Sequence, residues 1–165
     1  MENISDCSDP DFWTARYVAG KTPWDFGGVP AALKSFLARA SDTGKVLIPG
    51  CGSGYEVQAF HAAGNDVTAI DFSPAAVDQA KRALGLLAER VILGDFFTHD
   101  FGQCRFDLIY ERTFLCSMAP PRWPDYVNRT ADFRKRFQLL RSEAVTDSLP
   151  LFRDMERWQE WLKTN

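Results

Sequence analysis

The stretch Lys45–Asp71, KVLIPGCGSGYEVQAFHAAGNDVTAID, decides the fold of this 165-residue chain. It opens with a short apolar run, Val46–Ile48, which predicts a strand that is buried on both faces. Gly50, Gly52 and Gly54 follow on alternate positions. Glycine tolerates positive φ and has no Cβ, so a ligand can approach the backbone closely there. We therefore expect a glycine-rich turn directly after the first strand.

A helix and a second strand are expected after this turn. The pattern from Tyr55 to His61 predicts a helix, which Gly64 can end. Val67–Ile70 is a second apolar strand, and Asp71 stands at its end. Strand, turn, helix, strand and acid make a right-handed βαβ unit. Such a unit holds a nucleoside at the carboxyl ends of its strands, and its acid accepts hydrogen bonds from the ribose.

The spacing of the glycines bears on which nucleoside this is. A dinucleotide fingerprint has the form G-x-G-x-x-G, with a third glycine that lets the helix approach the pyrophosphate. Tyr55 stands at the position of that third glycine. The tighter G-x-G-x-G turn suits a ligand without a pyrophosphate, such as S-adenosylmethionine, and disfavours a dinucleotide oxidoreductase. The alternative interpretation is a surface turn that binds no ligand. The strand before the turn, the helix after it and the acid at the expected distance count against this alternative.

Two more strands are expected further along the chain. Val91–Asp95 is a third strand that ends in an acid, and Phe106–Tyr110 is a fourth. Several segments together resemble the thiopurine and thiol methyltransferase family of class I methyltransferases. These segments are TPWDFG, LIPGCGSGYEV, AIDFSPAAV, LGDFF and FDLIYERTFLCSM, and the resemblance runs from about Phe12 to Arg129 and resumes near Phe137.

The resemblance implies an α/β fold, a Rossmann-like three-layer sandwich. Its sheet would be mostly parallel, with a C-terminal antiparallel hairpin, and would lack one central strand of the usual seven. We expect a single methyltransferase domain over residues 1–165, with an N-terminal lid and helix (1–40), a cofactor-binding core (45–118) and a shortened C-terminal part (123–165). The implied cofactor is S-adenosyl-L-methionine, which leaves as S-adenosyl-L-homocysteine.

The resemblance also implies which residues contact the cofactor. Aromatic side chains are dense near the N-terminus, and Trp13, Tyr17 and Trp24 match family positions at the cofactor site. An aromatic face stabilises a sulfonium cation by about 0.5 to 2 kcal/mol. The alternative is a short amphipathic helix, about Asp11–Val18, that packs these rings on the core. The complete implied cofactor set is Trp13, Tyr17, Trp24, Gly50, Gly52, Gly54, Asp71, Asp95 and Phe96.

Roles for the acid after the third strand and for the segment after the fourth have alternatives. The family reading places Asp95 and Phe96 against the adenine, whereas Asp95 could instead cap a helix or turn. Glu111 is a candidate general base and Arg112 a candidate for steering an anionic substrate. They could instead pair with each other or with Asp107. Methyl transfer from a sulfonium needs mainly positioning and exclusion of water, so a soft nucleophile needs no strong base.

Beyond Pro120 the sequence departs from the family. Trp123–Phe133 predicts a helix with Tyr126, Val127 and Phe133 on its buried face. The family's next turn, fifth parallel strand and substrate loop have no counterpart, and strands over 137–145 and 157–162 follow instead. This hairpin is expected either to close on the fourth strand, giving the order 3-2-1-4 and then the hairpin, or to leave an edge that a second subunit covers. A homodimer is slightly favoured.

Composition limits the remaining possibilities. The formal net charge is −3 and 45% of residues are hydrophobic, which fits one globular domain without a nucleic-acid surface. No signal peptide, membrane span or metal-ligand spacing is recognised, so a cytoplasmic protein with reduced cysteines is expected. Two functions remain: a methyltransferase acting on a small soft nucleophile (a thiol, thiopurine-like compound, selenium or tellurium species, or halide), and a degenerate, non-catalytic cofactor-binding or interaction protein.

Overall fold

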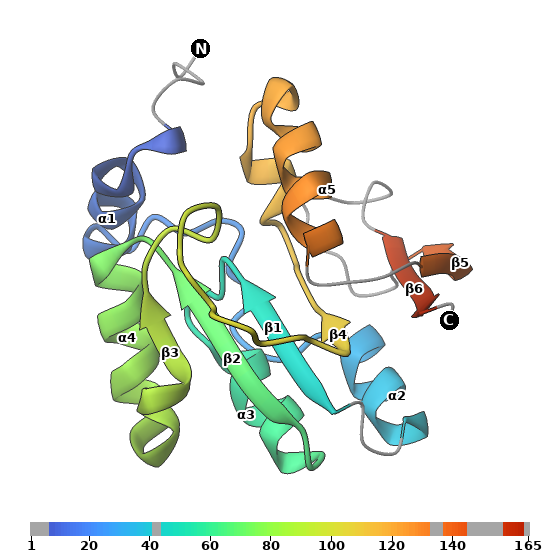
Figure 1. Cartoon of the computed structure of the whole chain (residues 1–165). Coiled ribbons are helices and arrows are strands. Elements are labelled where there is room, and N and C mark those ends of the chain that lie inside the picture. The colour runs from blue at the N-terminus through green and yellow to red at the C-terminus, as the bar shows by residue number, and fades with distance from the viewer. Residues whose placement is uncertain (1–6, 41–43, 133–136, 145–156, 164–165) are drawn as a thin grey trace.

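The computed structural model describes residues 7–40, 44–132, 137–144 and 157–163, and it contains a parallel four-stranded sheet. The strands are β1 (Lys45–Pro49), β2 (Asp66–Asp71), β3 (Val91–Leu93) and β4 (Leu108–Ile109). Their order is β3-β2-β1-β4, and every pair is parallel (Figure 1). The strand order therefore reverses at β1, and this switch point is where a doubly wound fold binds its ligand.

Helices flank this sheet. They are α1 (Pro10–Val18), α2 (Ala31–Arg39), α3 (Tyr55–Ala62), α4 (Pro74–Leu84) and α5 (Trp123–Asp132). Short 3-10 turns lie at η2 (Gly85–Arg90), η3 (Leu115–Ser117) and η4 (Pro120–Arg122). The expected start of α4 is confirmed: the hydroxyl of Ser73 accepts a hydrogen bond from the amide of Ala76, and Pro74 is the first helical residue.

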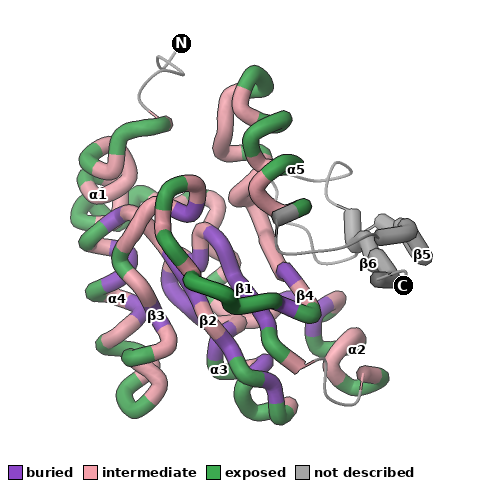
Figure 2. The backbone as a smooth tube through the Cα atoms, viewed as in Figure 1, coloured by how far each residue is buried: buried purple, intermediate pink, exposed green. Residues whose placement is uncertain are grey.

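Alternate residues of the strands point to opposite faces, and each face has its own core. The first core joins Val46 and Ile48 to Leu33 of α2, and it includes side chains of α3 and α4. The second core contains Leu47 and Ile70, and it is covered by aromatic rings from the loops after β3 and β4 and from α5. Figure 2 shows the buried residues concentrated along β1 and β2. The Rossmann-like, three-layer architecture expected from the sequence is confirmed.

The fourth strand is shorter than expected. Phe106 is buried, but the strand itself contains only Leu108 and Ile109. The carboxylate of Asp107 accepts a hydrogen bond from the amide of Lys45 at 3.0 Å, and the amide of Asp107 donates to the carbonyl of Lys45. This exchange beside the start of β1 takes the place of further regular pairing.

The C-terminal strands form a sheet of their own. β5 (Phe137–Ala144) pairs antiparallel with β6 (Arg157–Lys163), as expected for a hairpin. Among the described strands this pair is separate from the main sheet, so the structure does not show the first of the two alternatives, in which the hairpin extends the sheet beyond β4. The connection between β5 and β6 lies outside the described residues.

The helix α5 is present, but its predicted buried face is only partly correct. Tyr126 packs against the second core, as expected. Val127 is 61% exposed, so its predicted burial is wrong, because the helix presents the neighbouring Tyr126 to the sheet instead. The predicted burial of Phe133 falls outside the described residues. No helix within the described part of the chain is long and apolar enough to cross a membrane.

Candidate cofactor-binding site

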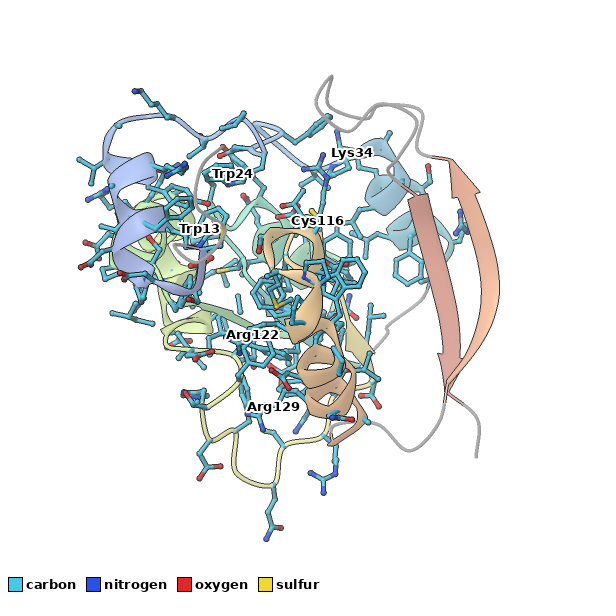
Figure 3. The ribbon with its side chains drawn as sticks, turned by 90° about the horizontal axis from the view of Figure 1, so that it is seen from above. Trp13, Trp24, Lys34, Cys116, Arg122 and Arg129 are labelled. Atoms are coloured by element: carbon cyan, nitrogen blue, oxygen red, sulfur yellow. The ribbon has the colours of Figure 1, made fainter. Side chains whose placement is uncertain are left out.

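A cavity of about 370 Å³ lies where β1, β2 and β3 end. Its walls come from α1 and the following loop, the glycine turn, the ends of β2 and β3, and the segment after β4. Figure 3 views this region from above and shows Trp13 and Trp24 beside each other on the α1 side, with Cys116 nearer to α5. A volume in this range suits a small organic ligand.

The glycine turn adopts the backbone conformation that its sequence predicted. Gly50, Gly52 and Gly54 have φ values of +61°, +50° and +75°. A Cβ at Gly50 would lie 2.3 Å from a ring carbon of Phe114, and one at Gly52 would lie 2.6 Å from the hydroxyl of Tyr17. Both positions therefore need glycine for space as well as for φ. Gly54 caps the start of α3 and lies outside the cavity lining.

Asp71 connects the end of β2 to the glycine turn. One carboxylate oxygen accepts a hydrogen bond from the amide of Gly52 at 2.9 Å, and the other accepts from the amide of Ser73 at 2.9 Å. Burial raises the pKa of this carboxyl, and the backbone donors partly offset that effect. Asp71 lines the cavity, at the position where a ribose-binding acid was expected.

The aromatic side chains expected to form a lid line the cavity. The rings of Trp13 and Trp24 meet edge to face with centroids 5.1 Å apart, and Tyr17 lies 6.0 Å from Trp24. The indole nitrogen of Trp24 donates to the hydroxyl of Tyr17 at 3.4 Å. Helix α1 has no fully buried residue, which favours the lid over the alternative of an aromatic face packed into the core.

Side-chain hydrogen bonds hold the lid to the core. The hydroxyl of Ser53, within the glycine turn, donates to Asp25 at 2.6 Å, and it accepts from Gln79 of α4 at 3.0 Å. Thr14 of α1 and Ser73 share a second contact, at 3.0 Å between their hydroxyls. These contacts place Trp13 and Trp24 over the ends of the strands.

The turn after β3 also lines the cavity. Asp95 accepts a hydrogen bond from the amide of Phe97 at 2.8 Å, so it caps this turn while its side chain borders the cavity. The ring of Phe96 is only 2% exposed and meets Phe97 and Phe114 edge to face. Phe96 and the half-buried Phe97 both line the cavity, and the sequence analysis did not propose a role for Phe97.

The structure separates Glu111 and Arg112. The carboxylate of Glu111 accepts from the amides of Phe114 and Leu115 at 3.1 and 3.0 Å, and it lies outside the cavity lining. Arg112 lines the cavity, donates to the carbonyl of Trp24 at 3.4 Å and lies 5.1 Å from the ring centre of Phe26. Asp107, the other expected partner, accepts instead from the amide of Lys45.

Glu56 and Cys51 are among the ionisable residues of the cavity wall that were not predicted from the sequence. Glu56, in the first turn of α3, has a pKa raised to about 7 by burial. Burial also raises the pKa of the Cys51 thiol well above its ordinary value, so this buried cysteine stays neutral. An acid placed directly after a glycine turn, at the start of a helix, was the available sequence signal for Glu56.

Comparison with known proteins shows the family of this chain. The model of the family "Thiopurine S-methyltransferase (TPMT)" matches residues 8–140. This chain belongs to the thiopurine S-methyltransferase family. The match includes the lid, the glycine turn and all of the expected cofactor-site and catalytic candidates, so the resemblance recognised in the sequence is confirmed.

The chain matches only part of the length of individual relatives. The chain is 33% identical over 119 residues to "Probable thiol methyltransferase 2" of Arabidopsis thaliana, covering 67% of the chain and 52% of the relative. It is 30% identical over 131 residues to "Thiopurine S-methyltransferase" of Methylococcus capsulatus, covering 68% and 59%. The chain thus spans between half and three fifths of the length of these curated relatives.

A solved structure supports the fold. The structure named "DhpI-SAM-HEP complex" is similar to 99% of this chain and 83% of its own, with a TM-score of 0.58 and 16% identity. At that identity the likeness concerns the fold alone. It confirms that a parallel sheet flanked by helices, as in other methyltransferases, is the architecture of this family member.

Proposed function

We propose that this protein binds S-adenosyl-L-methionine and transfers its methyl group to a small soft nucleophile. One observation carries the proposal: the glycine turn, Asp71 and the aromatic lid border one cavity at the point where the sheet reverses direction. Membership of the thiopurine S-methyltransferase family supports the same chemistry. The two curated relatives carry thiol and thiopurine methyltransferase names.

In this proposal each part of the cofactor meets a different wall. Asp71 accepts hydrogen bonds from the ribose hydroxyls, and the turn Asp95–Phe97 borders the adenine. The methionine part lies along the glycine turn, beside Gly50 and Gly52, which both line the cavity. The lid residues Trp13 and Trp24 face the sulfonium, whose positive charge an aromatic face stabilises by about 0.5 to 2 kcal/mol.

The chemistry is an in-line displacement. A lone pair of the acceptor forms a bond to the methyl carbon while the carbon–sulfur bond of the sulfonium breaks, and S-adenosyl-L-homocysteine leaves as a neutral thioether. The segment Glu111–Met118 follows β4 and borders the acceptor side of the cavity through residues that include Arg112, whereas Glu111 itself lies outside the cavity lining. We propose positioning and water exclusion as the main contributions, with Glu111 acting through the shape of this segment.

The acceptor is proposed by class. Thiols, thiopurine-like compounds, selenium and tellurium species and halides all present a polarisable lone pair, and none needs a strong base. Transfer of a labelled methyl group from S-adenosyl-L-methionine to a panel of these compounds tests the activity. Turnover of at least one class supports the proposal. Cofactor binding without turnover of any class would instead support the second candidate.

The second candidate is a non-catalytic protein that binds the cofactor or a partner. It is favoured by one observation: the fifth parallel strand that the family resemblance leads us to expect beyond β4 has no counterpart among the described strands, where the C-terminal pair forms its own sheet. A cavity that is intact on the cofactor side and open on the acceptor side would bind without transferring. The methyl-transfer panel separates the two functions.

A homodimer in the cytoplasm is the setting that we propose. Helix α5 exposes Trp123 (45%) and Val127 (61%) one turn apart, which gives a second subunit an apolar surface to cover. Sedimentation at micromolar concentration tests this directly. A dimer that dissociates in the variant Val127→Lys supports the arrangement, and a wild-type monomer would rule it out.

A further inference from the structure

Four acidic side chains line the cavity, and they differ in how they are held. Asp25 accepts from Ser53 and from the amide of Gly27, while Asp71 and Asp95 accept from backbone amides of their turns. Glu56 differs from these, because the donor that its carboxylate has among the described residues is its own backbone amide rather than a group of another residue. It therefore retains acceptor capacity toward the cavity.

The position of Glu56 relates it to the glycine turn. It is the second residue of α3, and this helix begins immediately after Gly54. Amide groups at a helix start favour a negative charge nearby. The carboxylate therefore stands beside the stretch of backbone where, in the proposed function, the methionine part of the cofactor lies. That part carries an α-ammonium group with three hydrogen-bond donors.

We propose that Glu56 binds the α-ammonium group of the cofactor and thereby selects ligands that carry an amino-acid tail. This inference rests on the proposed function and assigns one of its binding contacts. The other acids of the cavity wall accept hydrogen bonds from other residues, whereas Glu56 accepts only from its own backbone amide among the described residues and gains further donors when the ligand enters. Arg112 also lines the cavity and is near enough to lower the pKa of Glu56, but its positive charge suits an anionic group rather than an ammonium.

The inference gives binding a proton signature. Burial holds the pKa of Glu56 near 7, with Arg112 lowering it and Asp25 raising it, and Cys51 beside it stays neutral. At pH 6.5 roughly three quarters of a carboxyl with that pKa is protonated. An ammonium group favours the ionised form. Binding at pH 6.5 is therefore expected to release most of one proton from Glu56.

The test is calorimetric titration at pH 6.5 in two buffers of different ionisation enthalpy. The ligands are S-adenosylhomocysteine, its analogue without the amino group, and 5′-methylthioadenosine, which has no amino-acid tail. With the wild type we expect proton release for the first ligand alone, and affinity at least tenfold weaker for the other two. Proton release with 5′-methylthioadenosine would assign the proton to the ribose acid Asp71 and overturn the inference.

Substitution provides the second arm. Glu56→Gln is expected to lower the affinity for S-adenosylhomocysteine at least tenfold and to abolish proton release on binding. The affinity for 5′-methylthioadenosine should stay unchanged. Asp78→Asn, on the exposed face of α4, removes one negative charge away from the cavity and should change neither quantity. Equal weakening of all three ligands by Glu56→Gln would overturn the inference while leaving the cofactor site intact. Failure of the wild type to bind S-adenosylhomocysteine would overturn the proposed function as well.

Discussion

The carboxylate of Asp71 accepts a hydrogen bond from the amide of Gly52 at 2.9 Å, so the end of β2 directly fixes the turn that follows β1. Its second oxygen accepts from the amide of Ser73 at the start of α4. One side chain thus holds the first two strand ends and the next helix in place. The cavity depends on this arrangement.

Replacement of Asp71 should affect both stability and binding. Asp71→Ala leaves two backbone amides without their acceptor, and we expect the free energy of unfolding to fall by about 1–3 kcal/mol. Affinity for S-adenosylhomocysteine should fall at least tenfold. Asp66→Ala, at the opposite end of β2, breaks a surface pair with Arg90 and should cost under about 1 kcal/mol without changing affinity. Urea denaturation and calorimetry measure the two effects.

Substitutions at two glycines with positive φ distinguish the effect of backbone strain from the effect of a steric clash. Gly52→Ala places a methyl group 2.6 Å from the hydroxyl of Tyr17, whereas Gly64→Ala meets no atom within 4 Å. Both substitutions carry a backbone cost of about 1–2 kcal/mol, so both should lower the melting temperature. Only Gly52→Ala should also weaken the binding of S-adenosylhomocysteine, by tenfold or more. Equal affinity in the two variants would mean that the glycine turn does not contact the ligand.

The lid should distinguish a charged ligand from a neutral one. Trp24→Leu removes an aromatic face from the cavity and should weaken S-adenosylmethionine by about 0.5 to 2 kcal/mol more than neutral S-adenosylhomocysteine. Trp123→Leu changes an exposed tryptophan on α5 outside the cavity lining and should affect neither ligand. Parallel titrations with both ligands measure the difference. If Trp24→Leu weakened both ligands equally, the lid would provide contact area without cation recognition.

The raised pKa of Glu56 predicts that replacing this residue increases the free energy of unfolding in a pH-dependent way. In the unfolded chain this group ionises near pH 4.5, and in the folded protein near 7. The folded state therefore binds the proton more tightly, and wild-type stability is lost as pH rises through this window. Glu56→Gln should be more stable than wild type by about 1–3 kcal/mol at pH 8.5 and equal to it near pH 4. Urea denaturation at both pH values checks this, with Asp78→Asn unchanged.

Glu111 should act through structure rather than as a proton acceptor. Its carboxylate accepts from two backbone amides of the segment after β4, so Glu111→Gln should destabilise that segment and lower the melting temperature. The pH dependence of methyl transfer should keep its wild-type shape in Glu111→Gln. Loss of the acidic limb of that profile, where the rate falls as a base becomes protonated, would instead identify Glu111 as a general base.

The sequence predicted those features whose signals are local. The βαβ unit, the glycine turn and the Ser73 cap depend on neighbouring residues, and the structure confirms them. The contact of Tyr17 with Gly52 and the Ser53–Asp25 hydrogen bond join segments about thirty residues apart, so no local pattern encodes them. The exposure of Val127 was missed because Tyr126 and Val127 are adjacent, and helical periodicity did not decide which one faces the sheet.

The most direct test of the central claim is calorimetric titration of the purified protein with S-adenosylhomocysteine, run beside NAD under the same conditions. The cavity bordered by Gly52, Asp71 and Trp24 predicts micromolar affinity for S-adenosylhomocysteine and none for NAD. Tyr55 at the position of the third glycine is the reason to expect that difference. Binding of NAD, or of neither ligand, would contradict the account.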